Sequence, residues 1–411
     1  MQDARDEPPA PEVTRPPGSM LRCGPTGGID LDKSIVGFNV TDVEDVAAAA
    51  TDERALVTFA LRGDRGCEQD GCYVEHQVFA ISVGADGTAT RPKAPPNASA
   101  GISPSSDAVP FALGSELFLL TQGHAGPAPM VKPGQDAPDT LYLVHGDDVV
   151  ARTPQPFSGH FAAEGIGSAA LAIGTGSEWS SYRKGIRGPA SVRMFRLSRD
   201  QEPKNELVIK TPPSETMTEK YDAPAVAANA ERAAIAFRYQ GSKSSSRELL
   251  VAWVDPRVPK VLAPPLSVAK GDVGAPSLLL EDTTLHIVWS ERDAASQKYR
   301  FQHRVWPAGQ PAPQAGEPLH PLSENSRAPA IARVGSLVAA AWMDADGDRR
   351  GTVYAGFGPS LSDAIAAGVR RSAPDVRNAR DPEWATTATR ALLVWSEHDG
   401  PRRVRFSWCA P

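Results

Sequence analysis

Three stretches near the end of the chain align without a gap: "APSLLLEDTTLHIVWSERD" (275–293), "APAIARVGSLVAAAWMDAD" (328–346) and "DPEWATTATRALLVWSEHD" (381–399). An earlier stretch, "APAVAANAERAAIAFRYQG" (223–241), matches them. Their prolines, Pro224, Pro276, Pro329 and Pro382, are separated by 52, 53 and 53 residues. An aromatic residue follows each proline after 13 positions: Phe237, Trp289, Trp342 and Trp395. A fixed period of about 50 residues indicates an internally repeated fold.

Weaker copies extend towards the N-terminus when the proline is allowed to vary. They are "VAAAATDERALVTFALRG" (46–63), "VPFALGSELFLLTQG" (109–123) and "HFAAEGIGSAALAIGTG" (160–176). With these copies the repeat count becomes seven.

Each copy contains several short apolar runs separated by turns, a pattern typical of strands rather than helices. The third run is clear in "YRFQHRVW" (299–306) and "RVRFSWC" (403–409). Four antiparallel strands in about 50 residues form one propeller blade. The sequence therefore predicts an all-β, seven-bladed β-propeller of four-stranded antiparallel blades. Four tryptophans at pattern positions are predicted to lie in the core: Trp253, Trp289, Trp342 and Trp395.

The composition and net charge of the chain limit the kinds of molecule that it is expected to bind. The chain has 411 residues, 41% of them hydrophobic and 22% charged, with a net charge of -6. This acidic balance argues against nucleic acid as a partner. No apolar run approaches the roughly 18 residues that a transmembrane helix needs. We expect a monomer.

The N-terminal segment 1–22 is rich in proline and charge, which predicts a disordered linker ahead of a propeller domain spanning 23–411. It lacks the apolar region of a signal peptide. One interpretation is that a signal or lipid-anchor segment has been removed before it. The alternative is a cytosolic disordered tail.

The seventh copy ends at its third strand, so the ring needs a further strand for closure. We expect "DKSIVGFN" (32–39) to supply the missing outer strand, which would bring Cys23 close to Cys409. The sequence therefore predicts a Cys23–Cys409 disulfide. A second disulfide is predicted between Cys67 and Cys72, which enclose a short hairpin loop. Disulfides favour a secreted, periplasmic or cell-surface location. A zinc site at Cys67 and Cys72 would need a second pair of Cys or His ligands nearby, and the sequence offers none.

These repeats resemble the seven-bladed β-propellers and, more loosely, the sialidase-like repeat proteins of bacterial envelopes and secretions. The resemblance covers residues 32–411 and implies the fold. The sialidase Asp-box, Ser-x-Asp-x-Gly-x-Thr-Trp, is absent from every copy, and "WSERD" and "WSEHD" only echo it. Glycosidase activity therefore does not follow from this motif.

Loop length gives a candidate binding surface. The loops between the second and third strands are longer in the first four copies than in the last three, and long loops on a rigid scaffold carry binding residues. The third copy places Trp179, Tyr182, Arg183 and Arg187 in such a loop. We expect these four residues to contact a protein or carbohydrate partner of anionic or sugar character. The alternative is that the two aromatics pack onto neighbouring loops.

Two classes of function remain at this stage. The favoured one is a secreted or envelope-associated binding or scaffold module without catalytic activity. The alternative is a glycan-active hydrolase or lyase with a site at the mouth of the central channel. The ionisable residues at the starts of the copies would then converge there: Asp45, Asp107, His160, Asp222, Asp272, Arg327, Arg380 and Asp381.

No cofactor is expected. The eight histidines show no pairing at metal-ligand spacing. Asp344, Asp346 and Asp348 repeat the first spacings of a calcium loop, but the glycine is displaced and Ala355 stands at the twelfth position, so calcium is only a weak alternative.

Overall fold

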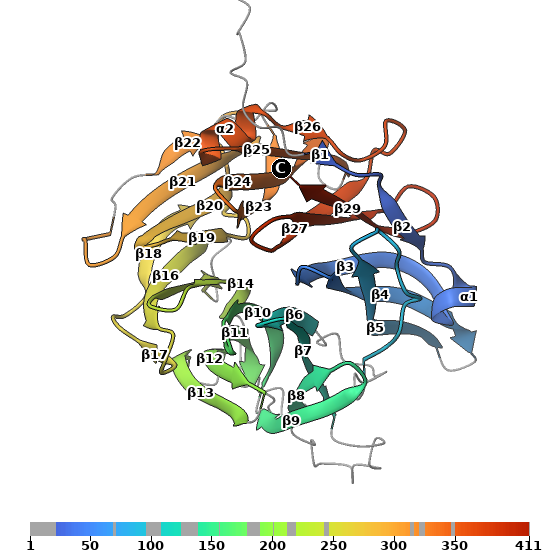
Figure 1. Ribbon diagram of the computed structural model, residues 1–411, viewed down its shortest axis with the longest axis horizontal. Coiled ribbons are helices and arrows are strands. Elements are labelled where there is room, and N and C mark those ends of the chain that lie inside the picture. The colour runs from blue at the N-terminus through green and yellow to red at the C-terminus, as the bar shows by residue number, and fades with distance from the viewer. Residues whose placement is uncertain are drawn as a thin grey trace, which may run out of the picture.

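Seven antiparallel sheets surround a central axis, so the chain forms a seven-bladed β-propeller as predicted (Figure 1). The structure is a computed structural model that describes residues 22–68, 71–95, 108–124, 139–155, 157–178, 190–199, 201–211, 219–241, 246–312, 316–319, 325–346 and 350–410. In most blades the first strand lies nearest the axis and later strands lie progressively further out. None of the described helices is long and apolar enough to cross a membrane.

The first two blades differ at their outer edges. In blade 1, three strands form the sheet and the segment 89–93 covers the edge through isolated bridges from Ala80 to Lys93 and from Val83 to Ala89. Blade 2 has the expected four strands. The strands are β3 (Asn39–Ala50), β4 (Arg54–Glu68) and β5 (Gly71–Gly84) in blade 1, and β6 (Ala108–Leu113), β7 (Glu116–His124), β8 (Asp139–His145) and β9 (Asp148–Gln155) in blade 2.

Blades 3 and 4 follow the same order, with one further edge strand in blade 4. Blade 3 consists of β10 (Phe157–Ile166), β11 (Ala169–Glu178), β12 (Ala190–Ser198) and β13 (Gln201–Lys210). Blade 4 consists of β14 (Lys220–Ala228), β15 (Ala233–Gln240), β16 (Arg247–Asp255), β17 (Lys260–Val261) and β18 (Leu266–Gly271), and both β17 and β18 pair with β16.

Blades 5 and 6 have short outermost strands. Blade 5 consists of β19 (Ser277–Glu281), β20 (Thr284–Arg292), β21 (Tyr299–Pro307) and β22 (Glu317–Leu319). Blade 6 consists of β23 (Ser326–Val334), β24 (Leu337–Asp346), β25 (Arg350–Gly358) and β26 (Val369–Arg370), with the helix α2 (Leu361–Ala366) between its last two strands.

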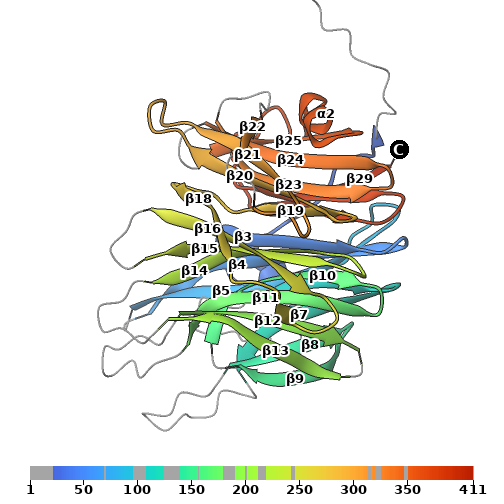
Figure 2. The ribbon, with the colours of Figure 1, turned by 90° about the vertical axis from the view of Figure 1, so that its left-hand side faces the viewer.

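Blade 7 contains both ends of the described chain. Its strands β27 (Ala379–Thr386), β28 (Ala391–Glu397) and β29 (Arg403–Ala410) are completed by β1 (Arg22–Cys23) and β2 (Gly27–Asp30), which both pair with β29. The register places Cys23 opposite Cys409, and the predicted disulfide joins them. The N-terminal strands therefore close the ring beside the C-terminus (Figures 1 and 2).

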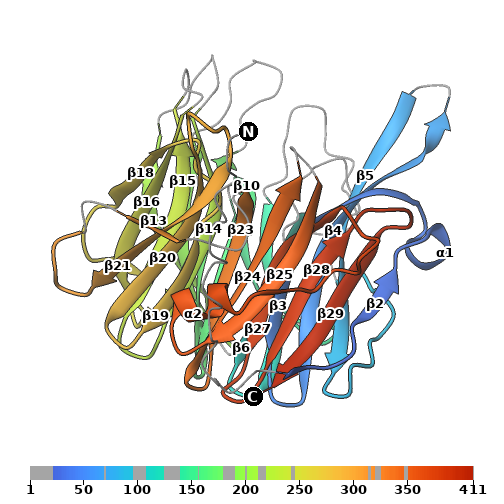
Figure 3. The ribbon, with the colours of Figure 1, turned by 90° about the horizontal axis from the view of Figure 1, so that it is seen from above.

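The closing strand is not the segment that the sequence indicated. Residues 32–39 do not join blade 7, because Lys33–Val36 form the short helix α1 at the rim of blade 1 (Figure 3). The side chain of Asp32 accepts hydrogen bonds from the amides of Ser34 and Ile35 and so caps this helix. Gly37 ends it with a φ of 88°, a conformation that glycine adopts without a steric penalty.

The repeated prolines mark a bulge on the inner strands. In blades 4, 6 and 7 the residue before the proline has a positive φ, and in blade 1 Asp45 stands before Val46 in the same conformation. The values are 51° at Asp45, 48° at Ala223, 48° at Ala328 and 50° at Asp381. The ladder of each inner strand shifts register there. Such bulges redirect side chains at the start of the inner strand.

A hydrophobic core lies between each pair of neighbouring blades, so seven separate cores hold the ring together. The aromatics of the repeat fill these cores: Trp289, Trp342 and Trp395 are 1%, 0% and 0% exposed, as predicted. Trp253 differs, because it lies on the third strand β16 and is only partly buried, with its ring edge-on to Trp306. Phe237 takes the buried position in blade 4.

The "WSE" motif of blades 5 and 7 is explained by a local hydrogen bond. The indole nitrogen of Trp289 donates to Glu291 at 3.3 Å, and that of Trp395 donates to Glu397 at 3.2 Å. Glu397 is 2% exposed and also pairs with Arg405 at 2.9 Å. The motif therefore satisfies buried polar groups of the blade.

Candidate active site in the central channel

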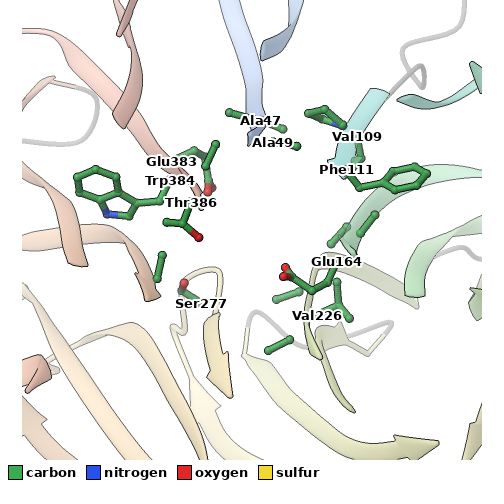
Figure 4. Close-up of a pocket in the computed structure, with 18 of the residues that line it drawn as sticks. Ala47, Ala49, Val109, Phe111, Glu164, Val226, Ser277, Glu383, Trp384 and Thr386 are labelled. Atoms are coloured by element: carbon green, nitrogen blue, oxygen red, sulfur yellow. The ribbon is translucent and has the colours of Figure 1, made fainter. Parts of the chain in front are cut away.

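The inner strands of the seven blades surround a central cavity of about 1550 Å³ (Figure 4). Its wall is built largely from alanine, as in the run Ala47–Ala50 of β3. Small side chains leave the space near the axis open, and Val109 and Val226 add apolar surface, whereas the ring of Phe111 points away from the channel into the core between blades 2 and 3 (Figure 4). A cavity of this size accommodates several sugar units or a ligand of similar bulk.

We call the end of the channel where the inner strands begin the N-terminal mouth, and the opposite end the C-terminal mouth. Five of the eight ionisable residues proposed for an enzyme line the cavity at the N-terminal mouth: Asp45, His160, Asp222, Arg380 and Asp381. The repeat therefore correctly predicted that residues at the starts of the copies converge.

Two more of the eight, Asp272 and Arg327, are absent from the cavity wall and meet at Tyr299 instead. The Tyr299 hydroxyl donates to the Asp272 carboxylate at 2.8 Å. The guanidinium carbon of Arg327 lies 4.0 Å from the centre of the Tyr299 ring. Burial and the hydrogen bond to Asp272 raise the pKa of Tyr299. Asp107, the eighth residue, lies outside the described residues.

A hydrogen-bonded chain crosses from blade 7 to blade 1 at the N-terminal mouth. The Nδ1 atom of His398 lies 3.0 Å from the Oδ1 atom of Asp42, and its Nε2 atom lies 2.9 Å from the Ser396 hydroxyl. Ser396 and His398 are buried, whereas the Asp42 side chain is 34% exposed and lines the cavity. Because Ser396 is inaccessible, the hydrogen bonds from Ser396 through His398 can orient Asp42, but they cannot present a serine nucleophile to a substrate.

Asp42 and Asp381, where blade 1 meets blade 7, have pKa values shifted in opposite directions. The hydrogen bond from His398, together with the charges of His398 and Arg380, lowers the pKa of Asp42. Burial raises the pKa of Asp381; the charges of His398 and Arg380 oppose this shift, and the smaller effects of Asp42 and Glu44 add to it. The mouth therefore stabilises the ionised form of Asp42 more than that of Asp381.

Glu383 and Glu164 project into the channel from blades 7 and 3, on opposite sides of the axis (Figure 4). Both side chains are exposed to the solvent that fills the channel, and the inner strands that surround them limit their hydration. This desolvation raises the pKa of Glu164 to about 7. Desolvation and the nearby charge of Asp381 raise the pKa of Glu383 to about 8.

Neither glutamate was singled out from the sequence, although the repeat contains a signal for one of them. Glu383 directly follows the anchor proline, where the copies in blades 4, 5 and 6 carry Ala225, Ser277 and Ala330. A carboxyl group at a position otherwise occupied by small residues marks a departure from the blade pattern. Glu164 likewise interrupts the apolar inner strand β10.

The arginines of the cavity wall are paired with carboxylates. Arg238 donates from Nε to Asp222 at 2.7 Å and from Nη1 to the carbonyl of Val273 at 3.2 Å. Arg380 lies 3.7 Å from Asp42. Arg333, at the C-terminal mouth, forms an ion pair with Glu281.

Several residues singled out in the sequence lie outside the described part of the chain. The proposed binding residues Trp179, Tyr182, Arg183 and Arg187 lie outside the described residues. So does Asp348 of the calcium-like loop. Within the described part of the chain, no three side chains of His, Cys, Asp or Glu are grouped so that they could hold a metal ion. The backbone register of the β4–β5 hairpin pairs Cys67 with Cys72, and this hairpin projects beyond the body of the ring (Figure 3).

No protein-family model matches the sequence, and a search of curated proteins finds no relative. Solved structures do share the fold. The polysaccharide lyase Uly1 is similar over 90% of this chain and 91% of its own, with 10% identity and a TM-score of 0.51. An endosialidase of phage phi92 matches over 91% of this chain and 67% of its own, with 10% identity and a TM-score of 0.45. An exo-1,5-alpha-L-arabinanase from a bovine ruminal metagenomic library matches over 90% and 94%, with 11% identity and a TM-score of 0.38.

At these identities the likeness shows the propeller fold. It also corrects the preferred functional expectation. A binding or scaffold module without catalytic activity was favoured from the sequence, whereas Uly1, which of these three structures has a TM-score above 0.5, is named as a polysaccharide lyase. The alternative from the sequence, a glycan-active enzyme, depends on the residues of the channel.

Proposed function

We propose that the protein is a glycan-cleaving enzyme that hydrolyses a glycosidic bond inside its central channel. The observation that carries this proposal is the placement of Glu383 and Glu164 on opposite walls of one cavity, with both carboxyl groups directed into it (Figure 4). Hydrolysis of a glycosidic bond uses two carboxyl groups on either side of the bond, one acid and one base.

The environments of the two glutamates favour different roles. Glu383 has the higher pKa, about 8, so it carries a proton at neutral pH and can donate it to the leaving glycosidic oxygen. Glu164, with a pKa of about 7, is partly ionised there and can accept a proton from a water molecule. That water attacks the anomeric carbon as the bond to the leaving oxygen breaks. The proton given by Glu383 remains on the new hydroxyl group.

The N-terminal mouth supports this chemistry. Asp381 lies two residues before Glu383 on the same strand, and its charge helps to keep Glu383 protonated. Asp42, held ionised by its hydrogen bond with His398, adds a fixed acceptor for sugar hydroxyls. Alanine-lined walls leave room for the rest of the glycan.

The proposal is tested with purified protein on a panel of polysaccharides, measuring new reducing ends. We expect activity on at least one of them, a loss of at least 100-fold in kcat for Glu383→Gln, and a similar loss for Glu164→Gln. Glu231→Gln, on the exposed turn between β14 and β15 and outside the cavity wall, should keep full activity.

The products distinguish hydrolysis from elimination. A lyase leaves an unsaturated sugar that absorbs ultraviolet light, whereas hydrolysis adds water and leaves no such chromophore. Saturated products support the proposal. Unsaturated products, or equal activity of Glu383→Gln and the unchanged protein, would overturn it.

The Cys23–Cys409 disulfide supports a further part of this proposal, namely that the enzyme works in an oxidising, extracytoplasmic compartment. Fractionation of cells that produce the protein, followed by thiol labelling without reductant, tests this. Unlabelled cysteines in the extracytoplasmic fraction are the expected result. Labelled Cys23 or Cys409 in a cytoplasmic fraction would contradict it.

A further inference from the structure

One continuous cavity runs along the axis of the ring, and Glu164 and Glu383 lie inside it rather than on a rim. Residues of the cavity wall both precede and follow each glutamate along the chain. A ligand therefore reaches the two carboxyl groups from within the channel. The neighbouring wall residues are 160–163, 165 and 167 for Glu164, and 380–382 and 384–388 for Glu383.

The wall of the channel is closed between neighbouring blades. Each of the seven hydrophobic cores joins two adjacent blades, including the first and the last. A Cβ atom at Gly165 would lie 2.0 Å from the carbonyl oxygen of Ala112, so β10 and β6 pass close together. These contacts leave no lateral opening in the described part of the wall. Hydrogen bonds between adjacent blades include Thr58 Oγ1 to Ala108 O at 2.7 Å, Gly114 N to Gly167 O at 2.7 Å, Asn229 Nδ2 to Asp282 O at 2.8 Å and Ile331 N to Ser277 Oγ at 3.0 Å.

The ring is also closed covalently. The Cys23–Cys409 disulfide joins β1 to β29 in blade 7, and the chain continues from β2 of this blade into β3 of blade 1. Beside this connection, Arg402 Nε donates to the carbonyl of Thr41 at 2.9 Å. A glycan therefore cannot enter from the side without rupture of the ring, and the two mouths are its routes to the glutamates.

The C-terminal mouth is framed by the turns between the first and second strands of the blades. Asp52, Ser115 and Ala388 on these turns are exposed and line the cavity, so the cavity reaches the surface here. The turns are too short to fold over the mouth. They comprise residues 51–53, 114–115, 167–168, 229–232, 282–283, 335–336 and 387–390.

The dimensions of the channel suit a single sugar chain. Residues 42–50 of β3 line it, and at about 3.3 Å per residue they make the passage roughly 30 Å long. A volume of about 1550 Å³ over that length gives a mean cross-section of about 50 Å². One extended glycan chain fits such a passage, whereas a chain folded back on itself does not.

We propose that the channel admits a glycan by a free end alone, so that the enzyme acts from the ends of an unbranched chain. This inference rests on the proposed function and names the form of its substrate. A cyclic glycan has no end to enter the channel. An internal bond of a long chain reaches Glu164 and Glu383 only after an end has been threaded through a mouth.

Access to the glutamates is measured first without turnover, by thiol labelling. Glu164→Cys places a thiol on the channel wall. The probes are maltoheptaose and β-cyclodextrin, each with a maleimide on a short linker; they contain the same number of glucose units, but only maltoheptaose has chain ends. We expect β-cyclodextrin to label the thiol at least tenfold more slowly, which corresponds to a difference of about 1.4 kcal/mol in the barrier. Val226→Cys, on the wall of blade 4, repeats the test at a second position.

The matched control is Glu231→Cys, on the exposed turn between β14 and β15 and outside the cavity wall. Both probes should label this thiol at the same rate. Labelling of the unchanged protein corrects for its native cysteines. Equal rates for the two probes at Glu164→Cys and Val226→Cys would overturn the inference, even if the protein proves to be a glycan hydrolase.

The pattern of cleavage tests the same inference on a substrate. New reducing ends and viscosity are followed together on a polysaccharide that the protein hydrolyses. Attack from chain ends should release reducing ends while the viscosity falls slowly. An early collapse of viscosity would show attack on internal bonds, which overturns the inference and leaves the proposed function intact. If no polysaccharide is hydrolysed, the proposed function fails, and the labelling rates still decide whether the channel admits chain ends alone.

Discussion

His398 of the last blade donates from Nδ1 to the Asp42 carboxylate of the first blade, across 3.0 Å. This hydrogen bond crosses the seam at which the ring closes. The backbone carbonyl of Thr41 accepts from Arg402 Nε at 2.9 Å beside it, and the Cys23–Cys409 disulfide holds the N-terminal strands of the same blade. The candidate site and the closure of the ring therefore depend on the same two blades.

Loss of the imidazole should destabilise the seam. His398→Phe leaves the Asp42 carboxylate without its donor, and hydrogen bonds to charged groups contribute about 2 kcal/mol. Because the pKa of Asp42 is lowered in the folded state, this contribution is present above its ordinary pKa of 3.8 and is lost as the pH falls further. Urea unfolding at pH 7 and pH 3 checks this. Ser396→Ala keeps the His398–Asp42 hydrogen bond, so at pH 7 it should lower the free energy of unfolding less than His398→Phe does. An equal decrease for both variants would contradict the role of His398 as the donor that stabilises the Asp42 carboxylate.

Glu383 should make the folded state less stable as the pH rises. The folded protein retains a proton on this group up to about pH 8, whereas the unfolded chain releases it near 4.5. The free energy of unfolding therefore decreases as the pH rises from 4.5 to about 8, and it stays constant at higher pH. Glu383→Gln removes this fall, so its melting temperature should exceed that of the unchanged protein at pH 8 and equal it at pH 4. A lower melting temperature at pH 8 would mean that the carboxylate is stabilised by the channel.

The ring-closing disulfide should contribute strongly to stability. It encloses 386 residues, for which the loss of chain entropy in the unfolded state amounts to at most about 6 kcal/mol. Cys23→Ser with Cys409→Ser should lower the free energy of unfolding towards this limit, and reductant should then have no further effect on ring closure. The matched control, Cys67→Ser with Cys72→Ser, should remain sensitive to reductant. An unchanged unfolding midpoint without the Cys23–Cys409 bond would contradict the closure.

A stacked histidine pair in blade 5 should make the fold sensitive to acid. His286 Nδ1 lies 3.0 Å from His303 Nε2, and His286 Nε2 lies 3.3 Å from Glu281. Burial lowers the pKa of His303 from 6.5 to about 4, with the charge of His286 acting in the same direction. The unfolded chain therefore binds a proton over this range that the folded protein does not, and stability should fall as the pH drops from 6.5 to 4. His303→Gln should flatten this decline in a thermal melt series, and an unchanged slope would show that other groups cause it.

Blade number and ring closure could be predicted because they depend on patterns that every copy repeats. Three of the four evenly spaced prolines, Pro224, Pro329 and Pro382, coincide with bulges, and the aromatics 13 residues after the prolines fill the cores between blades. The segment 32–39 was assigned wrongly, because its apolar residues fit a strand while Asp32 and Gly37 cap a helix. In this segment the helix caps therefore determine the structure, although the apolar residues are spaced as in a strand.

Only the residues of the candidate site that follow the repeat could be predicted from the sequence. Residues at the starts of the copies converge by symmetry, which placed Asp45, Asp222 and Asp381 correctly. Glu383 and Glu164 break the repeat, and a search for shared pattern passes over such residues. Pairs that join the first and the last blade, such as Asp42 with His398, are separated by more than 350 residues in the sequence and leave no local spacing to detect.

The most direct test of glycan hydrolysis in the channel is the pH dependence of kcat/KM from pH 5 to pH 10, for the unchanged protein and for Glu164→Gln. With Glu383 as the proton donor, kcat/KM should fall above pH 8 as that group loses its proton, and the same fall should persist in the residual activity of Glu164→Gln. The fall below pH 7 should disappear in the variant, because it belongs to Glu164. A profile without a fall near pH 8, or one in which Glu164→Gln abolishes that fall, would contradict the assignment of Glu383 as the acid.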